Sequence, residues 1–156
     1  MPRKKVESPE VPVEQRLIAG ISVAQWDTKW TRQDGGFGKL YTELNHKVGL
    51  YRADLNGCIV AIGLASESQN GGLRKRLADF RRPGSSGREH SMGRRIHDNI
   101  ERLDLHVLCT GSDWKGADVA AQLKKAMVEM HKPAWNVRQS LVTKAIIRSK
   151  AERVKK

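Results

Sequence analysis

The segment at residues 48–65 constrains the fold of this chain most strongly. Its sequence, VGLYRADLNGCIVAIGLA, contains two apolar runs that are separated by Asn56-Gly57. Asn-Gly supplies the positive φ angles that a two-residue hairpin turn requires, and apolar runs of this length and composition favour strands. The segment therefore predicts a β-hairpin, and with it an antiparallel sheet.

The charge of the chain is its strongest overall property. The 156 residues include 29 Lys or Arg against 17 Asp or Glu, which gives a formal net charge of +12. A length of this order fits one domain with its own core. A basic excess this large predicts binding to a polyanion, with DNA or another nucleic acid as the first expectation. An acidic protein partner, or a surface charged for solubility, are the alternatives.

The two cysteines, Cys58 and Cys109, both lie in apolar, strand-like runs. We expect buried free thiols in a reducing compartment, because two cysteines without a CxxC spacing favour neither a disulfide framework nor a structural zinc site. No apolar run approaches the length of about 18 residues that a membrane span needs. The beginning of the chain is charged and has no signal-peptide core. These features predict a cytoplasmic protein without membrane contact.

The remaining segments predict the organisation of the chain. Apolar residues recur at helical spacing over 73–82, 90–102 and 117–131, whereas 103–110 alternates as a strand does. We therefore expect an α+β fold, a small and mostly antiparallel three-stranded sheet flanked by helices in β-β-α-α-β-α order. The expected divisions are a disordered basic arm at 1–12, a partly helical extension at 13–46, the domain at 47–138 and a basic tail or helix at 139–156.

Several short motifs, in this order, resemble the signature of the GIY-YIG nuclease superfamily. GLY at 49–51 and AIG at 61–63 are similar to its two strand motifs. LRKRL at 73–77 resembles its arginine-bearing helix, and HKPAWNV at 131–137 resembles its closing element, a proline followed by an asparagine. The resemblance covers residues 48–137 and implies an endonuclease that hydrolyses phosphodiester bonds in DNA.

The resemblance also implies roles for single residues. Tyr51 matches the tyrosine that helps to deprotonate or position the attacking water, and Arg76 matches the arginine that stabilises the transition-state charge. Asn136 matches the asparagine that orients the site, and His90 lies where some members carry a water-positioning histidine. The residue types alone also fit plainer roles. These are a half-buried strand tyrosine, a surface arginine, a turn asparagine and an exposed histidine at a helix start.

Two positions depart from the family pattern. Ala61 stands where the second motif begins with tyrosine, and Lys124 stands where the metal-binding glutamate falls. An ammonium group cannot ligate Mg²⁺, which prefers anionic oxygen donors, but it could place a positive charge near a phosphate. Cleavage, with Mg²⁺ as the cofactor, is therefore one expectation. The other is a catalytically inactive module that binds DNA or an acidic protein.

Basic residues gather around the arginine-bearing helix. Between residues 73 and 95 there are eight Lys or Arg against two acidic residues. Such side chains contact the phosphate backbone and carry no sequence preference by themselves. The residues expected to bind nucleic acid are Arg74, Lys75, Arg81, Arg82, Arg88, Arg94, Arg95 and Lys124.

Overall fold

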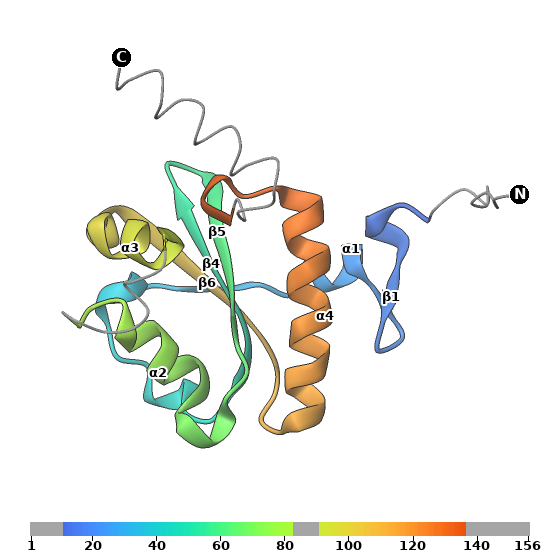
Figure 1. Ribbon diagram of the computed structural model, residues 1–156, viewed down its shortest axis with the longest axis horizontal. Coiled ribbons are helices and arrows are strands. Elements are labelled where there is room, and N and C mark those ends of the chain that lie inside the picture. Colours follow the sequence, from blue (N-terminus) through green and yellow to red (C-terminus); the bar gives the residue numbers. More distant parts are fainter. Residues whose placement is uncertain (1–10, 83–90, 137–156) are drawn as a thin grey trace, which may run out of the picture.

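The computed structural model describes residues 11–82 and 91–136, and their fold is α+β (Figure 1). The main sheet has four antiparallel strands in the order β3-β6-β4-β5. The expected three-stranded sheet is therefore wrong by one strand, because Thr31–Gln33 adds an edge. The strands are β3 (Thr31–Gln33), β4 (Val48–Leu55), β5 (Cys58–Ala65) and β6 (Leu103–Gly111).

The predicted hairpin is confirmed at β4 and β5. Leu55 pairs with Cys58 across the turn, where Asn56 and Gly57 have φ angles of 53° and 84°. These are the positive angles of a tight hairpin turn. From β4 onward, the helices and strands follow the expected order, β4-β5-α2-α3-β6-α4.

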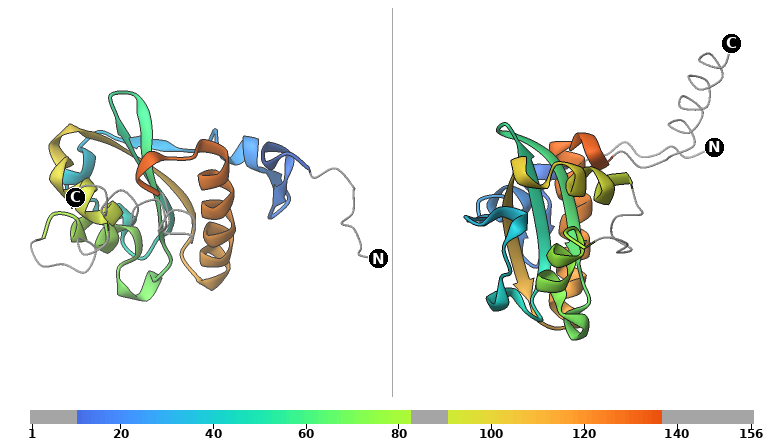
Figure 2. Two further views of the ribbon diagram at one scale, coloured as in Figure 1. Left: turned by 45° about the horizontal axis from the view of Figure 1, so that its top comes forward. Right: turned by 90° about the vertical axis from the view of Figure 1, so that its left-hand side faces the viewer.

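One face of the sheet is covered by α2 (Gly72–Asp79) and α3 (Ser91–Asp98). The right-hand view of Figure 2 looks onto these two helices, with the sheet behind them. Leu73, Leu77 and Phe80 are buried as their helical spacing predicted, and they pack in one core with Tyr51 from β4. The second helix is shorter than expected, because a 3-10 turn, η6 (Ile100–Arg102), follows α3.

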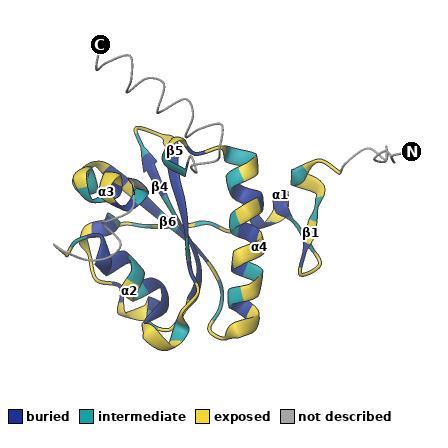
Figure 3. Cartoon of the chain, in the orientation of Figure 1, coloured by how far each residue is buried: buried dark blue, intermediate teal, exposed yellow. Residues whose placement is uncertain are grey.

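The opposite face is covered by α4 (Trp114–His131) together with the short helix α1 (Val23–Trp26). The strands and the inward faces of these helices form the buried interior in Figure 3. Helix α4 begins three residues before the expected start at 117. The reason is an N-cap, since the Asp113 carboxylate accepts a hydrogen bond of 3.0 Å from the Gly116 amide. The buried residues that this face shares include Leu50, Ile62, Leu108, Ala120, Leu123 and Met127.

In the N-terminal extension, which was expected to be partly helical, residues 17–22 form a hairpin rather than a helix. After the 3-10 turn η1 (Val13–Gln15), strands β1 (Leu17–Ile18) and β2 (Ile21–Ser22) form a small hairpin, and only then does α1 follow. The turn residues Ala19 and Gly20 have φ angles of 53° and 78°, which no helix allows.

Side chains fasten the extension to the end of α4. The Asp27 carboxylate accepts hydrogen bonds of 2.9 Å from the indole N–H of Trp30 and from His131. Arg16 forms an ion pair of 2.9 Å with Glu129. His131 thus binds the extension, and Lys132 in the left-handed conformation ends the helix.

Cys58 and Cys109 are free thiols but both are exposed, which corrects the expectation that they are buried. Cys58 directly follows the hairpin turn, and Cys109 lies near the end of β6. Strand alternation predicts the face of a residue, but it does not predict whether a helix covers that end of the sheet. Among the described residues, no helix is long and apolar enough to cross a membrane.

Candidate functional site

Tyr51 lies in the middle of the hairpin, on the sheet face that α2 covers. Its ring is only 3% exposed and packs against the ring of Phe80, with 5.4 Å between the ring centroids. The ring also covers Gly63, its partner on β5, where an added Cβ would lie 2.0 Å from the ring. The glycine of the second motif therefore makes room for the tyrosine of the first.

The environment of Tyr51 keeps its phenol protonated. Burial raises the pKa of Tyr51 to about 12, while the nearby Arg76 guanidinium lowers this pKa and the Asp79 carboxylate raises it. A buried phenol of this kind donates or accepts a hydrogen bond at neutral pH but does not act as a phenolate base.

Arg76 lies in a small depression between the end of β5 and helix α2. The depression is also lined by Asp79, a buried carboxylate that is only 7% exposed. Lys75 Nζ approaches a carboxylate oxygen of Asp79 to 3.2 Å, and Arg82 Nη1 approaches the other to 4.0 Å. One buried carboxylate thus gathers two exposed cations beside Arg76. Further lining residues are Ser66, Glu67 and Asn70.

Asn136 contacts the second motif directly. Its side-chain oxygen accepts a hydrogen bond of 2.8 Å from the Ile62 amide, and its side-chain nitrogen donates one of 2.8 Å to the Ile62 carbonyl. Asn136 belongs to the 3-10 turn η7 (Ala134–Asn136), which begins directly after Pro133, two residues beyond the end of α4 at His131. The side chain therefore pairs with the edge strand β5 as a short piece of strand would.

Six of the eight expected nucleic-acid-binding residues divide into three groups. Arg74 is half-buried and donates a hydrogen bond of 3.0 Å to Asn45, so part of its guanidinium is engaged within the fold. Lys75, Arg82, Arg94 and Arg95 are exposed along α2, its end and α3. Arg88 lies outside the described residues, as does His90, which was expected as a water-positioning histidine.

Lys124 does not line the depression beside Tyr51. It is half-buried on α4, and the buried side chains of α4 pack on the sheet face opposite to Tyr51. Ala61 is fully buried in the same core as Tyr51 and adds no polar group there.

The residues beside Tyr51 do not fit a Mg²⁺ site. Mg²⁺ prefers anionic oxygen ligands, and of the two carboxylates that line the depression Asp79 is already engaged by Lys75 and Arg82, which leaves Glu67 alone. Across residues 11–82 and 91–136, no group of three or more His, Cys, Asp or Glu is arranged to hold a metal ion. The positive charge at this place comes from Arg76 and its basic neighbours.

Asp79 is the site residue that sequence reasoning missed. The sequence feature that could have indicated Asp79 is its i,i+4 spacing from Lys75, because this spacing places opposite charges side by side on a helix. Its burial and its position near Tyr51 follow from how α2 packs on the sheet, which the sequence pattern does not specify.

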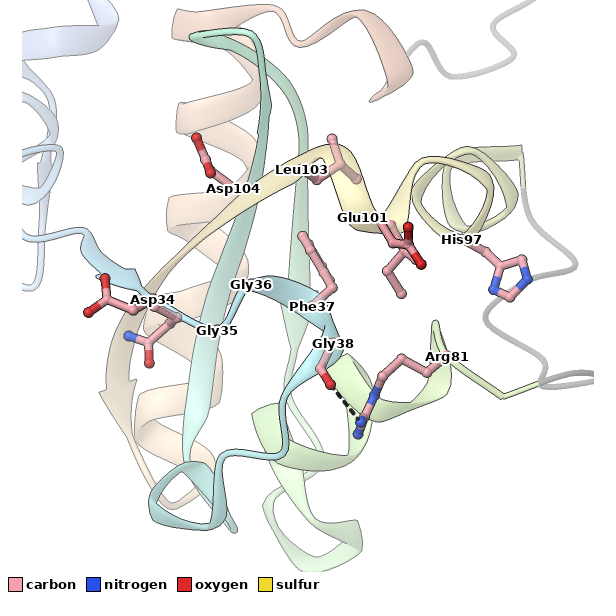
Figure 4. A pocket seen from close by; sticks show the side chains of 12 residues that line it. Asp34, Gly35, Gly36, Phe37, Gly38, Arg81, His97, Glu101, Leu103 and Asp104 are labelled. Carbon is pink, nitrogen blue, oxygen red and sulfur yellow. Dashed lines mark hydrogen bonds between the residues drawn. The ribbon is translucent and has the colours of Figure 1, made fainter.

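A second hollow, of about 540 Å³, lies on the same side of the molecule (Figure 4). It is bounded by the glycine-rich segment at 33–38, by Arg81 after the end of α2, and by the segment that joins α3 to β6. Figure 4 shows Arg81 reaching towards the Gly38 carbonyl, to which it donates a hydrogen bond of 3.4 Å. No motif in the sequence pointed to this cavity.

Comparisons of the chain with protein-family models, with curated proteins and with solved structures give no match. The assignment of the chain to a class therefore depends on its own motifs and on the geometry of the site.

The raised pKa of Tyr51 predicts alkaline destabilisation. The unfolded tyrosine ionises near its ordinary pKa of 10, whereas the folded one holds its proton to about pH 12. The Tyr51 contribution to the free energy of unfolding is therefore complete below pH 10 and is lost between pH 10 and 12. Denaturation of wild type and Tyr51→Phe across this range measures the contribution as the difference between the two proteins. Parallel pH profiles of the two proteins would contradict the burial of Tyr51.

Proposed function

We propose that the chain is a nucleic-acid-binding protein of the GIY-YIG nuclease superfamily, which receives a phosphodiester beside Tyr51 and Arg76. The observation that carries the proposal is the proximity of these two residues. They come from separate motifs, and the Arg76 guanidinium is close enough to lower the pKa of the Tyr51 phenol. The side chain of Asn136, from the last motif, bonds to the backbone of the second.

The charge around this site supports a polyanionic ligand. Lys75 and Arg82 are exposed beside Arg76, and Arg94 and Arg95 are exposed on α3. Elsewhere, the segments 1–10, 83–90 and 137–156 hold eleven Lys or Arg against four acidic residues, so +7 of the net charge of +12 belongs to them. We therefore expect the phosphate contacts to come from both the folded site and these segments.

Phosphodiester cleavage is the second candidate function, and the pairing of Tyr51 with Arg76 favours it. Arg76 would stabilise the negative charge that develops on the phosphate. The protonated phenol of Tyr51 would orient the phosphate or the water by a hydrogen bond, and another group would have to accept the proton. Since the donor set near Tyr51 does not fit Mg²⁺, binding is the main proposal.

Titration of labelled DNA at two salt concentrations tests the binding proposal. We expect affinity to fall steeply with salt, and Arg76→Gln and Lys75→Gln each to lower the slope of log affinity against log salt by about one. Lys125→Gln is the matched control, because it removes one exposed cation from α4 on the other side of the sheet. Absence of DNA binding at low salt would overturn the proposal and favour an acidic protein partner.

Incubation of plasmid and single-stranded DNA with Mg²⁺ or Mn²⁺ separates the two candidates. Products that Arg76→Gln abolishes would establish cleavage at this site. Intact DNA at stoichiometric protein, with tight binding retained, would leave a binding module with this fold.

A further inference from the structure

The cavity of about 540 Å³ is separate from the depression beside Tyr51. The rings of Phe37 and Phe80 lie between them, with centroids 5.9 Å apart, and Phe80 in turn contacts the ring of Tyr51. The volume falls within the range of roughly 300–1,000 Å³ that is usual for small-molecule sites. The cavity is therefore large enough for a ligand of its own.

Hydrogen bonds hold the walls of this cavity in place. The Tyr41 hydroxyl donates a bond of 2.7 Å to the Gly36 carbonyl, which fixes the 3-10 turn η2 (Gly36–Gly38). His97 Nδ1 donates a bond of 2.6 Å to the Phe80 carbonyl, which joins α3 to the end of α2. The walls are thus formed before any ligand binds.

One guanidinium and three carboxylates line the cavity, those of Arg81, Asp34, Glu101 and Asp104, and Asp104 pairs with Arg32. Arg81 comes from the end of α2 and Glu101 from η6, on the other side of the hollow (Figure 4). Among the described residues, the Nε of Arg81 is buried without a hydrogen-bond partner, and Arg81 forms no ion pair. Glu101 is exposed and also forms no ion pair there. The guanidinium of Arg81, which makes one long hydrogen bond to Gly38, and the carboxylate of Glu101 therefore bound the cavity on different walls.

We propose that this cavity binds one nucleotide unit, with its phosphate on Arg81 and the exocyclic amine of its base on Glu101. Arginine binds phosphate through two parallel hydrogen bonds, and a glutamate accepts from the amine of cytosine. The apolar side chains of Ile100 and Leu103, which also line the cavity, would contact the flat base. The inference rests on the proposed function, since it names the kind of nucleic-acid unit that the protein takes up.

Calorimetric titration with CMP and UMP tests the proposal. Wild type is expected to bind CMP more tightly than UMP, because the O4 of uracil would face the Glu101 carboxylate. Arg81→Gln is expected to lower the affinity for CMP and for UMP by about tenfold each, as the loss of a charged hydrogen bond does. Glu101→Gln is expected to abolish the preference for CMP, since an amide can donate to O4.

Gly38→Leu places a large apolar side chain at the wall of the cavity without straining the backbone. Gly38 lies on its wall, an added Cβ would meet nothing within 4 Å, and its φ is outside the left-handed region. This variant is expected to melt as wild type does and to lose nucleotide binding. Arg102→Gln is the matched charge control, because Arg102 is exposed beside Glu101 and does not line the cavity.

A single-stranded oligonucleotide with and without a 5′-phosphate distinguishes a free nucleotide from a strand end. Tighter binding of the phosphorylated strand, lost in Gly38→Leu, supports a strand end, whereas CMP binding without that difference supports the free nucleotide. If Gly38→Leu changes neither the affinity for CMP nor the effect of the 5′-phosphate, the cavity proposal is overturned, even where Arg76-dependent DNA binding persists. If CMP binds and DNA does not, the proposed function fails and the cavity site stands.

Discussion

Replacing Gly63 by alanine is expected to lower the free energy of unfolding by about 2–3 kcal/mol, at the upper end of overpacking effects. The added Cβ would lie 2.0 Å from Cζ and 2.1 Å from Oη of Tyr51. The ring cannot simply swing away, because Phe80 packs against it and only 3% of Tyr51 is exposed. Either the hairpin must open or the tyrosine must leave its place. Urea denaturation measures the loss of stability.

Two further variants make this expectation specific. Gly38→Ala is the matched control, since its Cβ would meet no atom within 4 Å, and it should leave stability unchanged. In a Tyr51→Ala background, Gly63→Ala should cost far less, because the two positions share one space. Equal costs of Gly63→Ala in both backgrounds would contradict the packing of Tyr51 on Gly63.

Local patterns were sufficient to predict the hairpin and the inward face of α2. The turn is encoded by Asn56-Gly57, because few residue pairs accept two consecutive positive φ angles. Leu73, Leu77 and Phe80 fall on one face of a helix at fixed spacing, so their burial follows from helical geometry alone. In both cases, the information lies within about ten residues of the chain.

The strand β3 could not be predicted in this way. It has only three residues, and it is a strand because it pairs with β6, where Arg32 lies opposite His106. Likewise, Ile18, Val23 and Trp26 pack against α4 from a hairpin and a single helical turn. Short segments of this kind take their structure from distant partners, which a local pattern does not contain.

The candidate site shows the same division between local and distant information. The motifs pointed to Tyr51 and Arg76 on two different elements, and the structure gives both of them positions beside Asp79. Counting charges did not distinguish exposed Arg94 from half-buried Arg74, which donates a hydrogen bond to Asn45. Whether a cation faces solvent or another side chain depends on packing, so a basic cluster in a sequence overestimates the number of available phosphate contacts.

Asn136→Asp is expected to destabilise the fold more than Asn136→Ala does at neutral pH. Alanine removes two hydrogen bonds to Ile62, a loss of about 1–3 kcal/mol in total. Aspartate keeps the acceptor for the Ile62 amide, but it replaces the donor to the Ile62 carbonyl by a charged oxygen at the same place. The repulsion between these oxygens adds to the loss, so Asn136→Asp should melt at the lower temperature.

Acidification separates this explanation from a general loss of packing. The repulsion raises the pKa of the introduced carboxyl in the folded protein above its unfolded value, which is about 3.9. The penalty is therefore absent below that value, where a protonated carboxyl donates to the Ile62 carbonyl, and it grows as the pH rises. The stability of Asn136→Asp relative to wild type should thus recover in acid, whereas that of Asn136→Ala should not. Gln15→Glu, an exchange of an amide for a carboxylate at an exposed position, should show no such recovery.

If the stabilities of both Asn136 variants respond alike to pH, the side-chain amide of Asn136 does not stabilise β5 through its hydrogen bonds to Ile62. The last motif would then contribute to the site by some means other than the pairing of Asn136 with the second motif.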